Sequence, residues 1–253
     1  MELKVIAYAR NGHTDKFGIP RQSRDESPIL TRIVFEPEYR IAEALRGIEG
    51  YSHLWLLWGF SENRVQNTEH RAQTDRDWSP TVRPPRLGGN KRMGVFATRS
   101  PFRPNPIGLS SVKLVGVENG DLIVSGADVL DGTPIYDIKP YLSFSDSHED
   151  AKNGFAEETK DYHLKVDWEM IGLITYQSPT NHLLITYYSP TNDILLDRRW
   201  KEEIEYILSQ DPRPGYQEDP EREYKLDYAG YTVTFVVKEQ TAVIKKIEQV
   251  SKR

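Results

Sequence analysis

The stretch Leu114-Val115-Gly116-Val117-Glu118-Asn119-Gly120-Asp121-Leu122-Ile123-Val124 places a turn dipeptide, Asn119-Gly120, between two apolar runs. Asn-Gly is favoured in the two-residue turns of β-hairpins, because both central residues of such turns need a positive φ. The stretch therefore predicts two antiparallel strands joined by a tight turn.

Other segments of the N-terminal half also have the pattern of strands. Residues 3–8, 30–35, 54–60, 93–98 and 108–117 show alternation or β-branched enrichment. Residues 54–60 are apolar on both faces, which predicts a strand buried on both sides. The one predicted helix is 37–45, with proline in its first turn. Many strands and one helix before residue 150 favour a β-barrel or a sandwich over a doubly wound sheet.

The C-terminal part follows a polar, acidic linker at residues 146–164. It contains a predicted strand at 166–171, an amphipathic helix at about 193–208 and a hairpin formed by 231–237 and 241–247. The fold class we predict is mainly β: an N-terminal barrel domain, residues 1–145, and a small α+β domain, residues 165–253.

Composition excludes several classes of function. The chain has no cysteine, so it has neither a disulfide framework nor a cysteine nucleophile. No stretch approaches the roughly 20 apolar residues of a membrane span, and residues 1–10 do not resemble a signal peptide. The six histidines lack paired spacing, and there is no dinucleotide fingerprint or P-loop. We expect a cytoplasmic protein with no metal and no membrane association.

The charge is unevenly distributed. Residues 64–104 contain nine Lys/Arg and three acids, a net charge of +6, whereas the whole chain carries −5. A concentrated basic segment suits a phosphate-bearing partner, because attraction to phosphates is local and screened. The alternative for such a run is a solvated loop.

Two blocks within this segment combine arginine with proline. Residues 81–90 and 99–108 are too rich in proline and glycine for a helix or a central strand. Stiff loops that present arginines suit phosphate or carboxylate recognition, since less entropy is lost per contact. For the two blocks together we favour this function over a pair of ordinary surface loops.

A third candidate is the acidic strand end that runs from Asp128 to Gly132. A carboxylate there can hold an amine, a ribose hydroxyl pair or a cation, although an Asx-turn uses the same residues.

These motifs together resemble the TrmO-type (TsaA-like) tRNA methyltransferases. The resemblance rests on residues 18–22, 52–55, 83–90, 94–100, 102–108 and 131–141, and on 211–216 near the C-terminus. It implies a non-Rossmann β-barrel that binds S-adenosylmethionine and works as a homodimer. The implied reaction is methylation of the exocyclic N6 of threonylcarbamoyladenosine at position 37 of tRNA, beside the anticodon.

The resemblance also assigns a cofactor site in the N-terminal domain. By position in the motifs, the residues expected to bind the cofactor are Pro20, Arg21, Gln22, Ser61, Glu62, Arg99, Leu109, Asp128, Val129, Leu130, Asp131 and Gly132. Arg99 and Leu109 are expected along the barrel strands.

The transfer reaction needs little acid–base chemistry beyond positioning, but the acceptor nitrogen must lose a proton. Asp131 is the candidate for that catalytic role, and capping the Gly132 turn is its alternative. The residues expected to bind tRNA phosphates are Arg83, Arg86, Lys91, Arg92 and Arg103, and Phe102, Tyr136 or Tyr141 are candidates to stack on the target base.

Two functions without catalysis remain open at this point. The first is an RNA- or nucleotide-binding barrel that keeps the surface but not the transfer activity. The second is a plain dimerisation scaffold, which would not need the arginine-proline loops.

Overall fold

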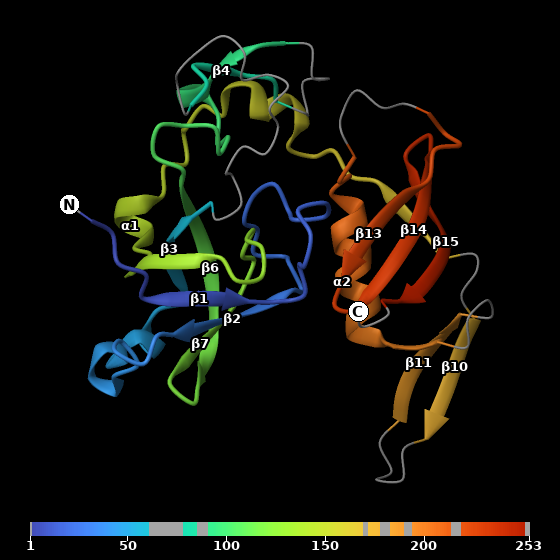
Figure 1. The fold of residues 1–253 in the computed structure, drawn as a ribbon, viewed down its shortest axis with the longest axis horizontal. Helices are drawn as coiled ribbons and strands as arrows, with labels where there is room; N and C mark the ends of the chain where they lie inside the picture. Colours follow the sequence, from blue (N-terminus) through green and yellow to red (C-terminus); the bar gives the residue numbers. More distant parts are fainter. Residues whose placement is uncertain are drawn as a thin grey trace.

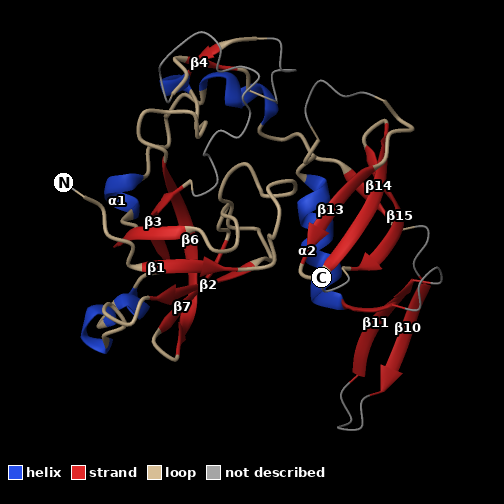
Figure 2. Ribbon diagram, viewed as in Figure 1, coloured by secondary structure: helices blue, strands red, loops and turns tan. Residues whose placement is uncertain are grey.

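The computed structural model describes residues 2–60, 78–84, 91–168, 172–177, 183–189, 194–213 and 219–250. Six strands close into an antiparallel barrel in the order β1-β2-β7-β6-β3-β8 (Figures 1 and 2). The strands are β1 Ala7–Arg10, β2 Leu30–Phe35, β3 His53–Gly59, β6 Ile107–Glu118, β7 Asp121–Ser125 and β8 Pro134–Pro140. The predicted mainly β fold with an N-terminal barrel is confirmed.

The β6–β7 turn has the predicted geometry. Asn119 and Gly120 have φ values of 53° and 78°, and Glu118 pairs with Asp121 across the turn. Positive φ at both central residues matches the right-handed twist of the flanking strands. The hairpin prediction is confirmed.

Alternate residues of the strands fill the barrel. Fully buried side chains from different strands pack in one cluster, among them Ile33, Leu54, Leu56, Val124 and Ile135. The other face of β3 is only half-buried, so the prediction that this strand is buried on both sides was wrong. A closed barrel has a single interior, and outside it Trp55 is covered by the ring of Tyr141, with 5.4 Å between the centroids.

Two local predictions in the N-terminal half were also wrong. The helix expected at 37–45 is a turn followed by a short 3-10 helix, η1 Ala42–Leu45, because Ile41 between them is extended. The strand expected at 93–98 is only β5 Met93–Gly94, which pairs with β4 Thr81–Val82 outside the barrel. The chain then turns into the 3-10 helix η4 Val95–Ala97, with the Val95 side chain buried.

The connection to the C-terminal part carries the short helices α1 Ser143–Asp146 and η5 Gly154–Thr159. A four-stranded sheet follows in the order β13-β14-β15-β9, with β9 parallel to β15 and the other pairs antiparallel. Its strands are β9 Lys165–Asp167, β13 Tyr224–Tyr228, β14 Tyr231–Lys238 and β15 Thr241–Gln249. The predicted hairpin is thus β14–β15, and β9 is shorter than the predicted 166–171.

Helix α2 Arg198–Ser209 covers this sheet and begins later than the predicted residue 193. The difference arises because residues 194–197 form β12 Ile194–Asp197, the edge of a second sheet in the order β10-β11-β12. The other two strands of that sheet are β10 Gly172–Gln177 and β11 Leu183–Ser189. The apolar side of α2, including Ile204 and Ile207, is fully buried in the core of the C-terminal part.

The loop between β1 and β2 docks on the C-terminal part. His13 and Tyr228 form an isolated antiparallel bridge, and the amide of Ala229 donates to the carbonyl of Gly12. Ile29, at the end of the same loop, is counted among the buried residues of the C-terminal core. This 11–29 loop therefore links the two parts of the molecule through both hydrogen bonds and apolar packing.

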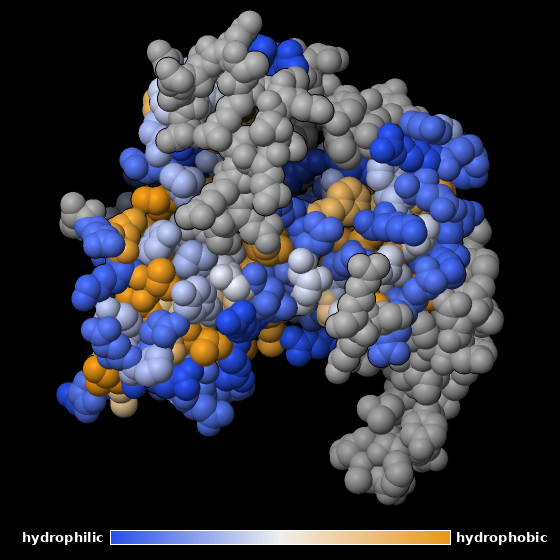
Figure 3. All heavy atoms as spheres, in the orientation of Figure 1, coloured by the Kyte–Doolittle hydropathy of each residue, from blue (hydrophilic) through white to orange (hydrophobic). Residues whose placement is uncertain are grey.

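On the face seen in Figure 3, small groups of hydrophobic residues alternate with hydrophilic ones over the barrel. Within the described ranges, no helix has the length and the apolar character needed to cross a membrane.

Candidate functional site

One end of the barrel opens into a cavity of about 1590 Å³. Pockets for small ligands commonly have about 300–1,000 Å³, so this one has room for more than one small molecule. Its walls come from the 11–29 loop, the arginine-proline segments, the start of β6, the strand end at Asp128 and Phe155 of the connection. Segments that are far apart in the sequence thus meet at this end of the barrel.

Most of the residues expected at a cofactor site line this cavity. They are Pro20, Arg21, Gln22, Arg99, Leu109, Asp128, Val129 and Leu130. Asp131 and Gly132 are not among the lining residues. Ser61 and Glu62 lie outside the described residues.

Asp128 is the carboxylate of the cavity wall. Its Oδ1 accepts a hydrogen bond from the hydroxyl of Ser110, which in turn accepts one from the indole Nε1 of Trp58 at 2.9 Å. Burial raises the pKa of Asp128, and the Ser110 hydrogen bond, the charge of Arg99 and a backbone hydrogen bond from Ser23 oppose part of that rise. The result is a carboxyl group whose pKa lies above its ordinary value in a pocket large enough for substrate.

Asp131 lies only three residues further along but has a different environment. Its Oδ1 accepts from the amide of Asn11 at 3.1 Å, and its Oδ2 forms an ion pair with Arg10 at 3.5 Å. Gly132 follows with a φ of 77°. The carboxylate thus contacts the end of β1 and not the Gly132 turn, whose amide donates to the carbonyl of Ala9, so the turn-capping alternative was wrong. The catalytic role expected of Asp131 stays a prediction.

The arginine-proline loops form another part of the cavity wall. Arg99 is exposed and follows η4, so the expectation that it lies along a barrel strand was wrong; Leu109 does lie on β6. Arg83 and Arg92 are exposed and line the cavity, whereas Lys91 is exposed without lining it.

Arg103 differs from the other predicted phosphate-binding residues. Its Nη2 donates to the carbonyls of Val95 at 3.3 Å and Thr98 at 3.1 Å. The guanidinium therefore holds the turn around η4 together at the cavity wall. Arg86 lies outside the described residues.

Aromatic residues at the cavity include two that sequence reasoning missed. Trp58 and Phe60, at the end of β3, pack edge to face with centroids 4.3 Å apart, and Phe102 lines the cavity half-exposed. Tyr136 and Tyr141 are not lining residues. Trp58 and Phe60 were hidden in an apolar strand, and only closure of the barrel shows that this strand ends at the cavity.

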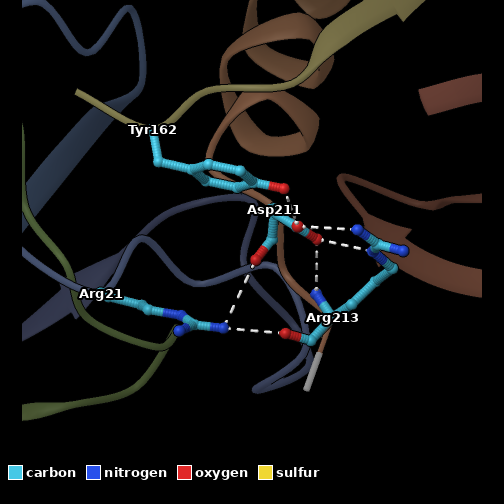
Figure 4. A network of polar contacts seen from close by, with 4 residues as sticks. All are labelled: Arg21, Tyr162, Asp211 and Arg213. Atoms are coloured by element: carbon cyan, nitrogen blue, oxygen red, sulfur yellow. Dashed lines mark hydrogen bonds and ion pairs between the residues drawn. The ribbon is translucent and has the colours of Figure 1, made fainter. Parts of the chain in front are cut away.

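The wall formed by residues 20–23 is held from both parts of the molecule. The Ser23 hydroxyl donates to the carbonyl of Ser111 on β6. Nη2 of Arg21 donates to the carbonyls of Asp211 at 3.4 Å and Arg213 at 2.9 Å, just beyond α2 (Figure 4). Sequence reasoning missed this link; its only signal was that the 211–216 segment belongs to the family resemblance.

The fold and the cavity define the class as a non-Rossmann β-barrel protein with an arginine-lined binding cavity. The sequence model of the tRNA-methyltransferase O N-terminal domain matches residues 8–147, and that of the TrmO C-terminal domain matches residues 195–250. The chain belongs to the tRNA-methyltransferase O family.

Individual relatives agree with this assignment. A tRNA (adenine(37)-N6)-methyltransferase of Eikenella corrodens is 40% identical over 200 residues, which cover 78% of this chain and 97% of the relative. The protein of the same name from Escherichia coli K12 is 36% identical over 224 residues, 87% of this chain and 85% of the relative. A crystal structure of TrmO from Pseudomonas aeruginosa superimposes with a TM-score of 0.68 at 29% identity, covering 98% of each chain.

Proposed function

We infer that this chain is an enzyme that transfers a methyl group from S-adenosylmethionine to N6 of adenosine 37 in tRNA. Relatives that share most of its length are named for this reaction. The structural observation that carries the inference is the convergence of residues 20–22, Arg99, Leu109 and 128–130 in one cavity. A binding barrel without catalysis is not favoured, because the relatives that share most of this chain's length are named methyltransferases.

The residues of the cavity fit the methyl donor. Arg99 is exposed and offers forked donors for a carboxylate, and Leu109 offers apolar surface. The bound donor supplies a methyl group on a positively charged sulfur. What the chain contributes is the position of the acceptor nitrogen, the exclusion of water and a place for the proton that leaves.

We propose that Asp128 accepts the proton that leaves the acceptor nitrogen. Its carboxylate lies in the cavity wall, and its pKa is raised. A raised pKa makes the carboxylate a better proton acceptor near neutral pH. Trp58 donates to the hydroxyl of Ser110, and this hydroxyl donates to Oδ1 of Asp128, so the two hydrogen bonds fix the orientation of the carboxylate. Asp131, by contrast, contacts the amide of Asn11 and the guanidinium of Arg10 with its two oxygens and does not line the cavity.

The acceptor we propose is threonylcarbamoyladenosine rather than plain adenosine. The family resemblance implies it, and the cavity is larger than one donor molecule needs. The test is incubation with labelled methyl donor and tRNA that does or does not carry the threonylcarbamoyl group, followed by nucleoside analysis. The proposed function would be contradicted if the label appeared in a nucleoside other than the one at position 37, or if neither tRNA were labelled.

The functional parts we propose are a cofactor domain at residues 1–145, a linker at 146–164 and a C-terminal domain at 165–253, in a cytoplasmic enzyme. The two family models support this division, since they match 8–147 and 195–250.

A first prediction separates the roles of the cavity arginines. Arg99→Ala is expected to weaken S-adenosylmethionine binding by about 1.5 kcal/mol, roughly tenfold, since the charge-assisted hydrogen bonds it offers are lost at an exposed site. Arg92→Ala is expected to leave donor affinity unchanged and to lower the salt slope of tRNA binding by roughly one. Calorimetry with the donor and tRNA titrations at several salt concentrations measure both. Identical effects of the two variants in both titrations would show one undivided site.

A second prediction concerns assembly. We propose a homodimer, because the family resemblance implies one and large aromatic side chains outside the cavity lining are exposed: Phe144 to 87% and Phe96 to 74%. Light scattering at micromolar concentration is expected to give about twice the chain mass of 29.2 kDa. A particle of the single-chain mass would refute the dimer.

A further inference from the structure

The loop that walls the cavity at residues 20–23 is anchored by groups that do not touch the cavity themselves. Asp211, Arg213 and Tyr162 are absent from its lining, yet the carbonyls of Asp211 and Arg213 accept the hydrogen bonds of Arg21 (Figure 4). The positions of these two carbonyls therefore set where the Arg21 side chain lies.

The two carbonyls are held in place by a network around the Asp211 carboxylate. Its Oδ1 accepts from the amide of Arg213 at 3.3 Å and from its Nε at 2.8 Å. Its Oδ2 accepts from Nη2 of Arg213 at 2.9 Å and from the hydroxyl of Tyr162 at 3.0 Å. The side chains of Asp211 and Arg213 are only 15% and 11% exposed, so the fork is well shielded from solvent.

The network is in turn fixed to the core of the C-terminal part. Asp211 has a φ of 48° and its amide donates to the carbonyl of Leu208, which is fully buried at the end of α2. Gly18, on the barrel side, lies so close to this core that a Cβ there would come within 2.3 Å of Leu226. The helix end and the loop thus have little freedom relative to each other.

From this arrangement, and resting on the proposed methyl-donor function of the cavity, we propose that Asp211 is a positioning residue for donor binding. It orders the carbonyls that hold Arg21, and through Arg21 it orders the 20–23 wall. The C-terminal part is then required for cofactor affinity, although the residues expected to contact the cofactor all lie in the barrel half. This refines the expectation that the N-terminal domain alone forms the site.

The test is Asp211→Asn in the full chain. Asn tolerates the left-handed backbone and keeps one acceptor oxygen, but it removes the charge that holds the Arg213 fork. Calorimetry with S-adenosylmethionine is expected to show about tenfold weaker binding, and kinetics a raised KM for the donor with kcat changed less than about twofold. Hydrogen exchange of residues 19–23 in the ligand-free protein is expected to rise.

The matched control is Arg24→Ala. Arg24 lies on the same loop and donates to the carbonyl of Lys160 at 3.0 Å, but it does not line the cavity. We expect its donor affinity and the exchange of residues 19–23 to equal those of the wild type. A loss as large as that of Asp211→Asn would mean that any loosening of the loop suffices, and it would overturn the specific role.

The role through Arg21 is tested by combining variants. If Asp211 acts by positioning Arg21, Asp211→Asn adds less than about twofold to the effect of Arg21→Ala. The proposal would be refuted if Asp211→Asn weakened donor binding by the same factor in the wild type and in Arg21→Ala. Wild-type donor affinity in Asp211→Asn would also refute it. If Asp211→Asn fails to fold, Tyr162→Phe removes one hydrogen bond from the same carboxylate at an exposed ring, with two- to threefold weaker binding expected.

Hydrogen exchange keeps the two proposals distinguishable. If the wild type binds no S-adenosylmethionine, the proposed function fails. Faster exchange at residues 19–23 in Asp211→Asn, with none in Arg24→Ala, would still support the positioning of the wall. Unchanged exchange would refute it independently of the ligand.

Discussion

Replacement of Asp128 by Asn is expected to lower kcat/KM for tRNA methylation by about 100-fold or more. Loss of a positioned proton acceptor commonly costs 10²- to 10⁴-fold. Asn keeps the shape and an acceptor for the Ser110 hydroxyl, so the cavity should persist. Because burial already disfavours the charged carboxyl and raises its pKa, thermal stability at neutral pH should stay equal or increase.

The pH profile makes this prediction specific. In the wild type, kcat/KM should fall as the pH drops through the raised pKa of Asp128, because only the ionised form accepts a proton. That limb should be lost in Asp128→Asn. Asp131→Asn decides between the two carboxylates: a 100-fold loss there, with Asp128→Asn near wild type, would return the catalytic role to Asp131.

The second large effect is on stability and arises from His13. Its ring is 1% exposed against Tyr228, with 5.1 Å between the centroids, and its Nε2 has no hydrogen-bond partner among the described residues. Burial lowers the pKa of His13 from 6.5 to about 4. Between these values the unfolded chain binds a proton that the folded protein does not, so stability falls as the pH falls.

The expected loss is about 3 kcal/mol of unfolding free energy between pH 7 and pH 4, in addition to the effects of other groups. His13→Phe keeps a ring against Tyr228 but cannot be protonated. Denaturant unfolding of both proteins at a series of pH values measures the difference. If the two curves run parallel below pH 6.5, His13 does not control acid stability.

The site of His13 explains why the effect reaches beyond the barrel. It lies where the 11–29 loop meets β13, and Tyr228 in turn donates to Glu203 on α2 at 2.9 Å. A proton on His13 therefore weakens a contact between the C-terminal part and the 11–29 loop, which also contains residues 20–23. We expect donor affinity to decrease over the same pH range.

Local chemistry was enough to predict much of the barrel. Asn119-Gly120 defined its own turn, since only two backbone angles and the flanking apolar runs are needed. The alternating residues of β2 and the β-branched pattern of β14 likewise predicted strands near their observed positions. Predictions failed where contacts with distant segments decide the structure. At residues 93–98 the strand ends after two residues, and Val95 is buried in the 3-10 helix that follows.

The candidate site shows the same division. By itself the sequence determined which short segments carry arginine, proline and acid. Of the twelve cofactor residues that its resemblance to a family named, eight line the cavity. Only the tertiary structure decided that Asp128 faces the cavity while Asp131 contacts Arg10 and Asn11. It also decided that Arg21 is held from 190 residues further along the chain. The physical reason is that residue type and spacing set what a side chain can do, whereas its partners, burial and pKa depend on which distant segments the fold brings against it.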